Sequence, residues 1–424
     1  MIDIKLIREQ PELVRKALQD RQEDPSTVDK VLELDEQRRS FIQQVEALKA
    51  DRNVVSKEIG KSKDQGQREA KIEAMRLVGD RISALDQELR EMQSEFDVLM
   101  STIPNIPSPE TPYGTSEEDN VFDEPIGEEP VFGFEPKPHW ELGPELGIIN
   151  FEQGVKITGS RFYVLSGAGA RLQRALIAWM LDLHSRQGYT EKYPPFMVRS
   201  KTLFGAGQLP KFADNLYKDH EEDLWMVPTA EVPLTGIHMD EILNEDDLPF
   251  HYTAYTPCFR REKMSAGRDV RGMKRGHQFD KVEMYIYCKP EDSDAQFEKM
   301  VADAESTCRE LGLRYRKGKL CTGDLGFGAS ITYDIEVWVP GSQEWMEVSS
   351  ISNVTDFQAR RSNIRYKTGK RGRNEFVHTL NGSGLGLPRT FIAVLENNQQ
   401  PDGSVIVPEV LRPWMGGIDV ISPG

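Results

Sequence analysis

A basic cluster between Arg260 and Lys281 contains the residues of this sequence that are best suited to chemistry. Eight Lys and Arg residues stand there against three acidic ones, although the whole chain has a formal net charge of −16. A concentration of cations in an acidic protein favours a bound polyanion such as a nucleotide. A hydrated loop on an edge hairpin is the alternative interpretation of the same charges.

The residues around this cluster predict two β-strands joined in a hairpin. Aromatic and β-branched residues are frequent over 251–259 and again over 277–287, whereas glycine and charged residues fill 263–276. We therefore expect two neighbouring antiparallel strands with a long basic loop between them.

One face of this hairpin has the composition of a binding site. Side chains alternate along a strand, so Phe279, Lys281 and Glu283 share a face. Phe279 could stack on a purine, and Glu283 could bind an ammonium group. Arg260 and Arg275 could bind phosphate oxygens.

The triplet Thr229-Ala230-Glu231 ends an apolar stretch with a hydroxyl and a carboxylate. Thr229 is a candidate helix N-cap, and Glu231 is a first-turn acid that favours the helix dipole. Taken alone, the triplet fits this structural role better than a binding role.

Two further strands are predicted over 331–339 and 344–350, and the second carries Glu347 and Ser350. Carboxylate and hydroxyl oxygens near a phosphate suit Mg²⁺, which prefers oxygen ligands. A solvated strand end would have the same composition.

The segment 381–390 predicts a glycine-rich turn directly before a helix over 390–397. Backbone amides at such a turn can bind an anion, with Arg389 at its mouth. Neither a P-loop nor a GxGxxG fingerprint accompanies these elements. We therefore predict a nucleotide site on an antiparallel sheet.

Composition bounds the remaining possibilities. The chain has 424 residues with 29% charged and 8% aromatic side chains, as is typical of a soluble globular protein with more than one domain. The N-terminal residues lack an apolar signal-type region, so we expect neither secretion nor membrane insertion. Four scattered cysteines without CxxC spacing favour a reducing cytoplasm and argue against a zinc site.

The first hundred residues predict a coiled-coil hairpin. Apolar residues recur at spacings of three and four from Ile72 to Leu99, and a seven-residue repeat runs from Leu34 to Val55. Residues 60–67 have the composition of a turn between the two helices. Such an arm needs a partner, and dimerisation or scaffolding is the simplest use of it.

A change in composition marks a domain boundary after this arm. Residues 108–135 contain nine acidic residues and no basic one, which predicts an extended linker. We divide the chain into a helical arm over 1–102, a Pro-rich acidic linker over 103–138 and a second domain over 139–424. That domain should open with a helix over 171–186 and a proline-broken strand over 189–198.

These motifs together resemble bacterial-type seryl-tRNA synthetases, which are class II aminoacyl-tRNA synthetases. The resemblance extends from the first residues to the last, and it is carried by YTEKYPPFMV, TAE, FRRE…GRDVRGMKRGHQFDKVEM, EVSSISNVTDFQARRSNIRY and HTLNGSGLGLPRTFIAVLENNQQPDGSVIVPEVLRP. It implies an α+β fold with an antiparallel six- to seven-stranded sheet flanked by helices, an N-terminal coiled-coil arm and a homodimer.

The resemblance also implies two reactions and a set of site residues. ATP would activate L-serine to seryl-adenylate, and the seryl group would pass to the 3′-terminal adenosine of tRNA(Ser) and also of tRNA(Sec). Arg260 and Arg389 would be the catalytic residues. The implied ATP contacts are Arg260, Arg261, Glu262, Arg275, Gly276, Phe279, Glu347, Val348, Ser349, Ser350 and Arg389, with Mg²⁺ held through ATP at Glu347 and Ser350. The implied serine contacts are Thr229, Ala230, Glu231, Glu283 and Ser383. The implied tRNA contacts are Lys57, Lys61, Lys63, Arg68 and Lys71.

The hairpin loop departs from the family pattern at several positions. Arg261 stands where a small residue is common, Lys263-Met264 replaces a small pair, and Gly276 replaces a branched apolar residue. Two other functions stay open on the sequence: a class II ligase that loads a small amino acid on a carrier protein, and a coiled-coil interaction protein without enzymatic activity. The first would be expected to lack the arm, and the second has no use for Arg260, Glu262 and Arg389.

Overall fold

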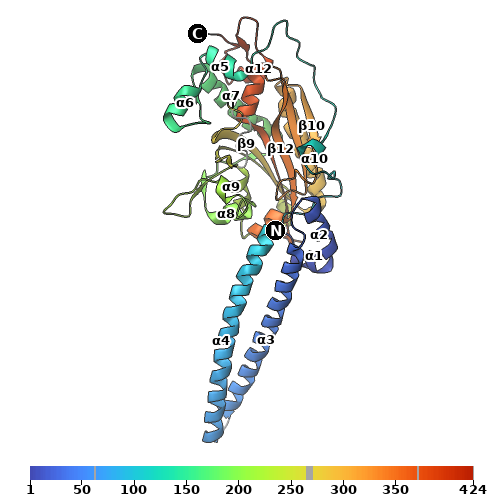
Figure 1. The fold of residues 1–424 in the computed structure, drawn as a ribbon, viewed down its shortest axis with the longest axis vertical. Helices are drawn as coiled ribbons and strands as arrows, with labels where there is room; N and C mark the ends of the chain where they lie inside the picture. The colour runs from blue at the N-terminus through green and yellow to red at the C-terminus, as the bar shows by residue number, and fades with distance from the viewer. Residues whose placement is uncertain (62–63, 264–270, 370–371, 424) are drawn as a thin grey trace. The chain divides into compact units, whose positions relative to one another are not determined.

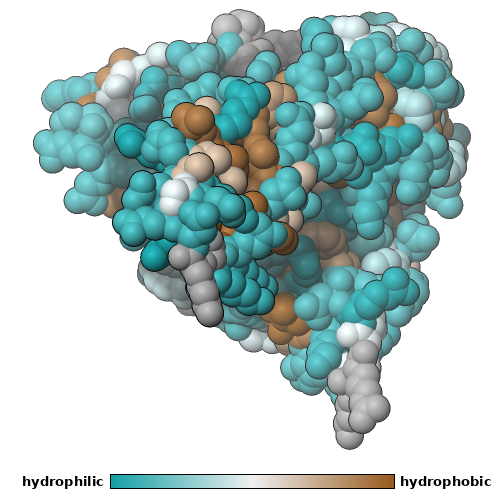
Figure 2. All heavy atoms as spheres, turned by 90° about the horizontal axis from the view of Figure 1, so that it is seen from below, coloured by the Kyte–Doolittle hydropathy of each residue, from teal (hydrophilic) through white to brown (hydrophobic). Residues whose placement is uncertain are grey.

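A computed structural model describes residues 1–61, 64–263, 271–369 and 372–423, and it divides the chain into two compact units (Figure 1). One unit comprises residues 2–104, and the other comprises Met1 with residues 105–424. None of the described helices combines the length and the apolar character needed to cross a membrane. Hydrophilic residues predominate on the face drawn in Figure 2.

The first unit is the predicted helical arm. Its helices are α1 (Ile4–Glu9), α2 (Pro11–Asp20), α3 (Thr27–Lys61) and α4 (Gln65–Thr102). Pro11 begins α2, where its missing N–H costs nothing. Asp64 caps α4 by accepting a hydrogen bond from Gln67 N at 3.1 Å.

The two long helices pack along the predicted apolar seam, which confirms the coiled-coil hairpin. Val45, Ile82, Leu85 and Phe96 are all buried, and they come from both helices. Ile72 is 49% exposed, so the seam loosens toward the turn. Burial of apolar surface stabilises a fold by about 25 cal/mol per Å², and a seam between only two helices buries little apolar surface. The arm therefore gains little stability from its own packing.

The second unit is built on a large, mostly antiparallel sheet. Among the described residues it has eight strands, in the order β1 (Val121–Phe122), β10 (Tyr315–Lys319), β11 (Ile331–Val339), β12 (Glu344–Thr355), β15 (His378–Gly386), β9 (Gln278–Cys288), β8 (Phe250–Phe259) and β4 (Thr190–Glu191). The expected six to seven strands become eight because two-residue strands are added at the edges, of which β4 runs parallel to β8.

Helices pack against both faces of this sheet (Figure 1). They are α5 (His139–Glu145), α6 (Phe151–Thr158), α7 (Gly167–Arg186), α8 (Ser200–Gly205), α9 (Glu231–Gly236), α10 (Ser293–Glu310), α11 (Phe357–Ser362) and α12 (Leu387–Asn397). Residues of α7, α10 and α12 form the main core with one face, and residues of α9 and α11 form a smaller core with the other. The minor strands are β2 (Ile149–Asn150), β3 (Val164–Leu165), β5 (Met197–Val198), β6 (Trp225–Met226), β7 (Ile242–Asn244), β13 (Arg365–Lys367), β14 (Asn374–Phe376), β16 (Val405–Ile406) and β17 (Val420–Ile421).

The predicted hairpin is present as β8 and β9. Its register pairs Cys258 with Phe279 and Thr256 with Lys281, which fixes the two faces of β9. Val282, Met284 and Ile286 lie in the main core. The alternate residues are therefore left for the opposite face, as the sequence predicted.

The predicted glycine-rich turn before the last helix is wrong. Residues 381–386 belong to β15, a central strand, and α12 begins at Leu387 rather than at Thr390. The glycines serve close packing instead: a Cβ at Gly384 would lie 2.2 Å from His184 Nε2, and one at Gly382 would lie 3.0 Å from Ile351 Cγ1. A strand whose backbone packs closely against neighbouring side chains is rich in glycine, and so is a turn. Composition therefore does not distinguish the two.

The acidic segment over 105–138 is extended, but it is attached to the second unit. Asn105 Nδ2 donates to Val354 O at 2.9 Å, and Ser108 N donates to Ser330 O at 2.8 Å. Val121 pairs with Lys319 at the edge of the sheet. Backbone groups that the sequence left to water are thus satisfied by the sheet.

Candidate active site

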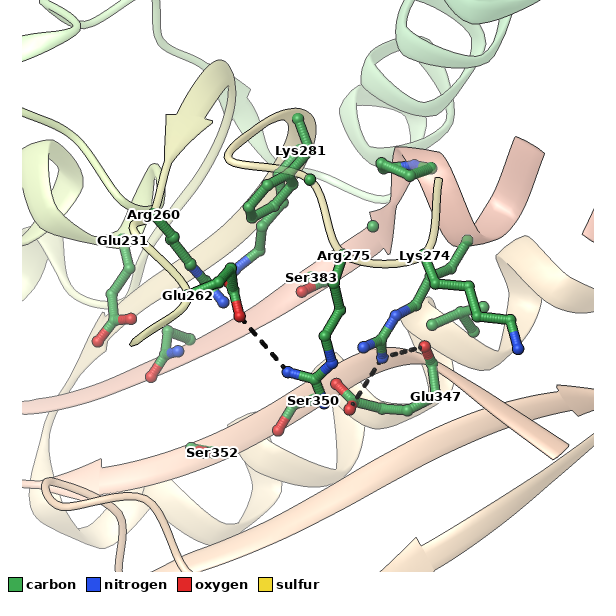
Figure 3. A pocket seen from close by; sticks show the side chains of 17 residues that line it. Glu231, Arg260, Glu262, Lys274, Arg275, Lys281, Glu347, Ser350, Ser352 and Ser383 are labelled. Carbon is green, nitrogen blue, oxygen red and sulfur yellow. Dashed lines mark hydrogen bonds and ion pairs between the residues drawn. The ribbon is translucent and has the colours of Figure 1, made fainter. Parts of the chain in front are cut away.

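A cavity of about 320 Å³ lies on the sheet face opposite the main core (Figure 3). Strands β9, β12 and β15, the end of the hairpin loop and the start of α12 all contribute to it. Its lining residues are Glu231, Arg260, Glu262, Lys274, Arg275, Gly276, Phe279, Lys281, Glu347, Val348, Ser350, Ser352, Asn381, Ser383, Gly386, Pro388 and Arg389. Most of the residues predicted for ATP are therefore brought together.

The hairpin supplies an aromatic ring with cations beside it. The Arg260 guanidinium lies 5.0 Å from the centre of the Phe279 ring, and Arg260 Nε donates to Pro228 O at 3.1 Å. Arg275 Nη1 lies 3.6 Å from Glu262 Oε2. Both arginines point into the cavity (Figure 3), where they could bind phosphate oxygens without a change of backbone.

A second cation enters the cavity from α12. Arg389 Nη1 donates to Glu347 Oε2 at 3.0 Å and to Glu347 O at 2.7 Å. Burial would raise the pKa of the Glu347 carboxyl, but the charge of Arg389, followed by Arg260 and Arg275, lowers it below its usual value. Glu347 therefore stays ionised next to Ser350, which suits a metal ion.

Glu231 lines the opposite end of the cavity, and a second carboxylate, Glu283, is buried beside the cavity wall. Glu283 is fully buried, and its Oε2 accepts from Thr229 Oγ1 at 3.3 Å. Glu231 lines the cavity, and burial, followed by the charge of Glu283, raises its pKa to about 7. Ser383 also faces the cavity. This end can bind an ammonium group and a hydroxyl together.

The helix expected at the Thr229-Ala230-Glu231 triplet is α9, but Ala230 rather than Thr229 is its N-cap residue. Thr229 Oγ1 accepts from Glu231 N at 3.3 Å. The predicted first-turn position of Glu231 is confirmed, whereas the predicted N-cap role of Thr229 is wrong. Ala230 is fully buried in the smaller core and does not line the cavity.

Sequence reasoning missed Gln358 and gave Lys281 no role. Gln358 Nε2 donates to Glu231 Oε1 at 2.6 Å, while its Oε1 accepts from Tyr285 and Thr379 at 2.8 Å each. The two hydroxyls fix the amide, which in turn fixes Glu231. Nothing local marks Gln358, because it comes from α11, far from Glu231 in the chain. Lys281 could have been found from its position between Phe279 and Glu283 on one face.

Two predicted ATP contacts lie outside the cavity lining. Arg261 is exposed, and its guanidinium lies 4.9 Å from the centre of the Tyr217 ring, outside the lining. Ser349 is buried and donates to Ser383 O at 2.6 Å from behind the cavity wall. Gly276 does line the cavity, and a Cβ there would lie 2.9 Å from Gln278 O, so this backbone has little room for a larger residue. Met264 lies outside the described residues.

The residues predicted for tRNA gather near the turn of the arm. Lys57, Lys61 and Arg68 are exposed. Lys71 Nζ pairs with Glu58 Oε2 at 2.8 Å. Lys63 lies outside the described residues. Exposed cations of this kind can contact a nucleic-acid backbone without reading bases.

Comparison with known proteins assigns both units to one group. Residues 1–107 match the family model described as "Seryl-tRNA synthetase N-terminal domain", and residues 212–398 match "tRNA synthetase class II core domain (G, H, P, S and T)". A Roseiflexus protein named serine–tRNA ligase is 63% identical over 99% of each chain. A Chloroflexus aurantiacus protein of the same name is 59% identical over 100% of both chains. The structure of seryl-tRNA synthetase from Pyrococcus horikoshii complexed with ATP has a TM-score of 0.94 at 39% identity, with both chains fully covered.

Proposed function

Because the chain belongs to the seryl-tRNA synthetase family, we propose that it activates L-serine with ATP and then transfers the seryl group to tRNA(Ser). One observation carries the proposal at the level of the site. A single cavity of about 320 Å³ has arginines suited to phosphates at one end and, at the other, the Glu231 carboxylate in front of the buried Glu283, which suit an ammonium. A nucleotide and a small amino acid would therefore meet end to end.

In the first step a serine carboxylate oxygen attacks the α-phosphorus of ATP, and pyrophosphate leaves. Arg260 binds the α-phosphate and stabilises the charge that develops on it in the transition state. Phe279 stacks on the adenine, and Glu262 contacts the adenine edge. Arg389 binds the γ-phosphate, for which its guanidinium must first release the Glu347 carboxylate. Positioning and charge stabilisation are sufficient, because phosphoryl transfer needs little covalent help from the protein.

The residues around Glu347 fit Mg²⁺. Glu347 and Ser350 present oxygen ligands to the cavity. Asp334 Oδ1, on the neighbouring strand, is buried without a hydrogen-bond partner among the described residues. Burial, followed by the charge of Glu347, raises the pKa of Asp334 well above its usual value. We propose that Glu347 and Ser350 hold Mg²⁺ that arrives with ATP, where the ion would neutralise phosphate charge.

Serine is selected by polar groups that its competitors leave unpaired. Thr229, Glu231 and Glu283 surround the ammonium, and Glu283 with Ser383 receives the hydroxyl. Glu283 Oε1 is buried and has no donor in the part of the chain that the structure describes, so a substrate donor would satisfy it. Alanine would leave it unsatisfied, a discrimination that sites of this type raise to about 10⁴-fold.

Serine binding should tighten as the pH rises from 6 to 8. The ammonium requires ionised Glu231, whose pKa is raised to about 7 by burial and by Glu283, although Lys281, Gln358 and Arg260 lower it. Below this pKa the carboxyl is neutral, so the KM for serine should increase about 10-fold between pH 8 and pH 6. Pyrophosphate exchange at saturating ATP measures this KM. Glu231→Gln should remove the slope, and a slope that persists would place the titration elsewhere.

Phe279→Ala should weaken ATP binding much more than serine binding. The substitution removes the ring on which adenine stacks, and the KM for ATP should rise roughly 30-fold while the KM for serine stays within about 2-fold. Phe279→Trp keeps an aromatic face and is the matched control. Equal KM values for ATP in the Ala and Trp variants would contradict the stacking role.

In the second step the arm presents tRNA to the site. Lys57, Lys61, Lys63, Arg68 and Lys71 would contact the backbone of the long variable arm of tRNA(Ser), leaving the anticodon unread. tRNA(Sec) has the same long arm and is proposed as a second acceptor. Loading of a carrier protein is the competing function, and the arm argues against it.

We also propose that the chain acts as a cytoplasmic homodimer. Tyr193 is 81% exposed and Met197 is 44% exposed, and a groove next to them is lined by Pro194, Pro195 and Pro233 among other residues. An exposed apolar surface of this kind favours a protein partner. Light scattering at micromolar concentration tests the dimer. All four cysteines are buried and unpaired, which supports a reducing compartment.

The experiment that tests the function is amino-acid-dependent exchange of pyrophosphate into ATP. Serine, threonine, alanine and glycine are compared, and then tRNA(Ser) is offered to the enzyme. Serine-specific exchange followed by charging of tRNA supports the proposal. A preference for glycine or alanine without tRNA charging would favour the carrier-protein ligase.

A further inference from the structure

The serine end of the cavity already contains a cation. Lys281 Nζ lies 2.5 Å from Glu283 Oε2 and 2.9 Å from Thr229 Oγ1. These are two of the acceptors that the proposed function gives to the ammonium of serine, so the present inference rests on that function. Lys281 is a primary ammonium with the same charge and the same three donors as the substrate ammonium.

The burial of this pair makes simple removal of Lys281 costly. The Lys281 side chain is 12% exposed, and the Glu283 side chain is fully buried. Removing the cation that pairs with a buried carboxylate is strongly destabilising, because the carboxylate charge is then left uncompensated in a buried site. Glu231 is a second carboxylate close to this pair, because its pKa is raised by the charge of Glu283 and lowered by that of Lys281. Removing Lys281 would therefore leave two neighbouring carboxylates without its positive charge. The ammonium position therefore stays filled until another cation arrives.

We propose that Lys281 holds the ammonium position while serine is absent, and that serine binds by exchanging with it. The ammonium and the carboxylate of serine are bonded to the same carbon atom. Once the ammonium lies between Thr229 and Glu283, the carboxylate must lie a few Å away on the open side of the cavity, where Arg260 binds the α-phosphate. The displaced Lys281 ammonium, which lines the same cavity, pairs with that carboxylate.

The exchange balances in charge at every stage. Before binding, the lysine ammonium pairs with the Glu283 carboxylate. After binding, the serine ammonium pairs with Glu283, and the serine carboxylate pairs with Lys281. When a carboxylate oxygen forms its bond to the α-phosphorus, the bond to the pyrophosphate oxygen breaks and its electron pair leaves with pyrophosphate. No proton is transferred by Lys281, which acts as a positioning cation.

This exchange makes the site selective for zwitterions. An amine without a carboxylate, such as serinol, would displace Lys281 and leave the lysine ammonium unpaired near Arg260. Serine compensates the displaced lysine with its own carboxylate. Because of Lys281, an ammonium group binds well only when the same molecule also carries the carboxylate that reacts with ATP.

The test compares serine and serinol on the wild type, Lys281→Met and Lys281→Arg. Exchange kinetics give the KM and kcat for serine, and competition against serine gives the Ki for serinol. In Lys281→Met the kcat/KM for serine should fall roughly 100-fold, whereas serinol should bind about 10-fold more tightly because its competitor is gone. Lys281→Arg keeps a cation that can pair with carboxylates, so its kcat/KM should stay within about 10-fold of the wild type with serinol still weak.

Lys289→Met is the matched control, because it removes a lysine next to the end of β9 that pairs with Glu291 at 3.3 Å outside the cavity. Lys289→Met should leave the kcat/KM for serine and the Ki for serinol unchanged. Equal weakening of serine and serinol in Lys281→Met would mean a structural role and overturn the proposal, as would unchanged serine kinetics. If Lys281→Met melts early or fails to bind ATP, the comparison of serine and serinol on the wild type is the test. Wild-type enzyme that binds serinol as tightly as serine would overturn the proposed displacement of Lys281 by serine. Absence of serine-dependent exchange in the wild type would instead refute the proposed function.

Discussion

Arg260→Ala is expected to lower serine-dependent pyrophosphate exchange by roughly 10³-fold, with kcat taking most of the loss. Arg260 is the cation that projects from the end of β8 between the two ends of the cavity, beside Phe279 at one side and Glu231 at the other. It is therefore placed at the point where serine and ATP meet. An interaction made mainly in the transition state reduces kcat rather than raising KM.

Arg260→Lys is the informative companion to this variant. Lysine keeps the charge but offers a point cation instead of a planar fork, and it would give up the contact of the guanidinium with the Phe279 ring. We expect it to recover about 10-fold of the lost activity. Both variants should bind ATP and unfold near the wild-type temperature. An Arg260→Ala enzyme that exchanges pyrophosphate at the wild-type rate would remove Arg260 from the mechanism.

Shortening the arm is expected to separate the two steps of the reaction. Without the turn and its basic residues, charging of tRNA(Ser) should fall roughly 10³-fold in kcat/KM, while pyrophosphate exchange should stay within about 2-fold. The cavity residues all belong to the other unit, so the adenylating site has no need of the turn. Loss of both activities together would contradict this division.

The structure indicates where the arm can be cut. Lys49 Nζ and an Asp86 carboxylate oxygen lie 3.1 Å apart across the seam, so α3 and α4 are adjacent there. Replacing residues 50–85 with a short Gly-Ser link preserves Val45 and Phe96, which are buried in the seam on the retained side.

A matched pair of variants separates charge from length in the intact arm. Lys61 and Arg68 are replaced by alanine in one protein, and the exposed Lys30 and Arg90 are replaced in the other. The first should reduce charging and flatten its salt dependence, because fewer counterions are released on binding. The second should behave like the wild type. Equal effects would mean that general charge, rather than contact near the turn, attracts tRNA.

Local pattern was sufficient to predict the elements on which the site is built. The β8–β9 hairpin, the face shared by Phe279, Lys281 and Glu283, and the two arm helices all follow from side-chain periods of two or about 3.6 residues. Such periods survive in any tertiary setting, since a strand or helix must bury its apolar side. The resemblance to a family then supplied the function and the joint use of residues far apart in the chain.

Composition alone misled where one residue type serves two purposes. The glycines of 382–386 looked like an anion-binding turn, yet they belong to β15, where Ile351 crowds a Cβ at Gly382 and His184 blocks one at Gly384. The acidic segment looked like a free linker, yet it hydrogen-bonds to the second unit through the Asn105 side chain and the Ser108 backbone N–H. Glycine and polar residues show that a segment has no apolar face to bury. Whether such a segment forms a turn, a free linker or a closely packed strand depends on the residues around it in the folded protein.

The sequence by itself determined the basic hairpin, the helices of the arm and, through its resemblance, the family. The tertiary structure decided which polar groups from distant segments pair: Arg389 with Glu347 and Gln358 with Glu231. These pairings depend on sheet order and strand register, which bring together residues far apart in the chain. An ionic interaction falls off within a few Å and strengthens with burial, so it cannot be assigned before the partners are placed.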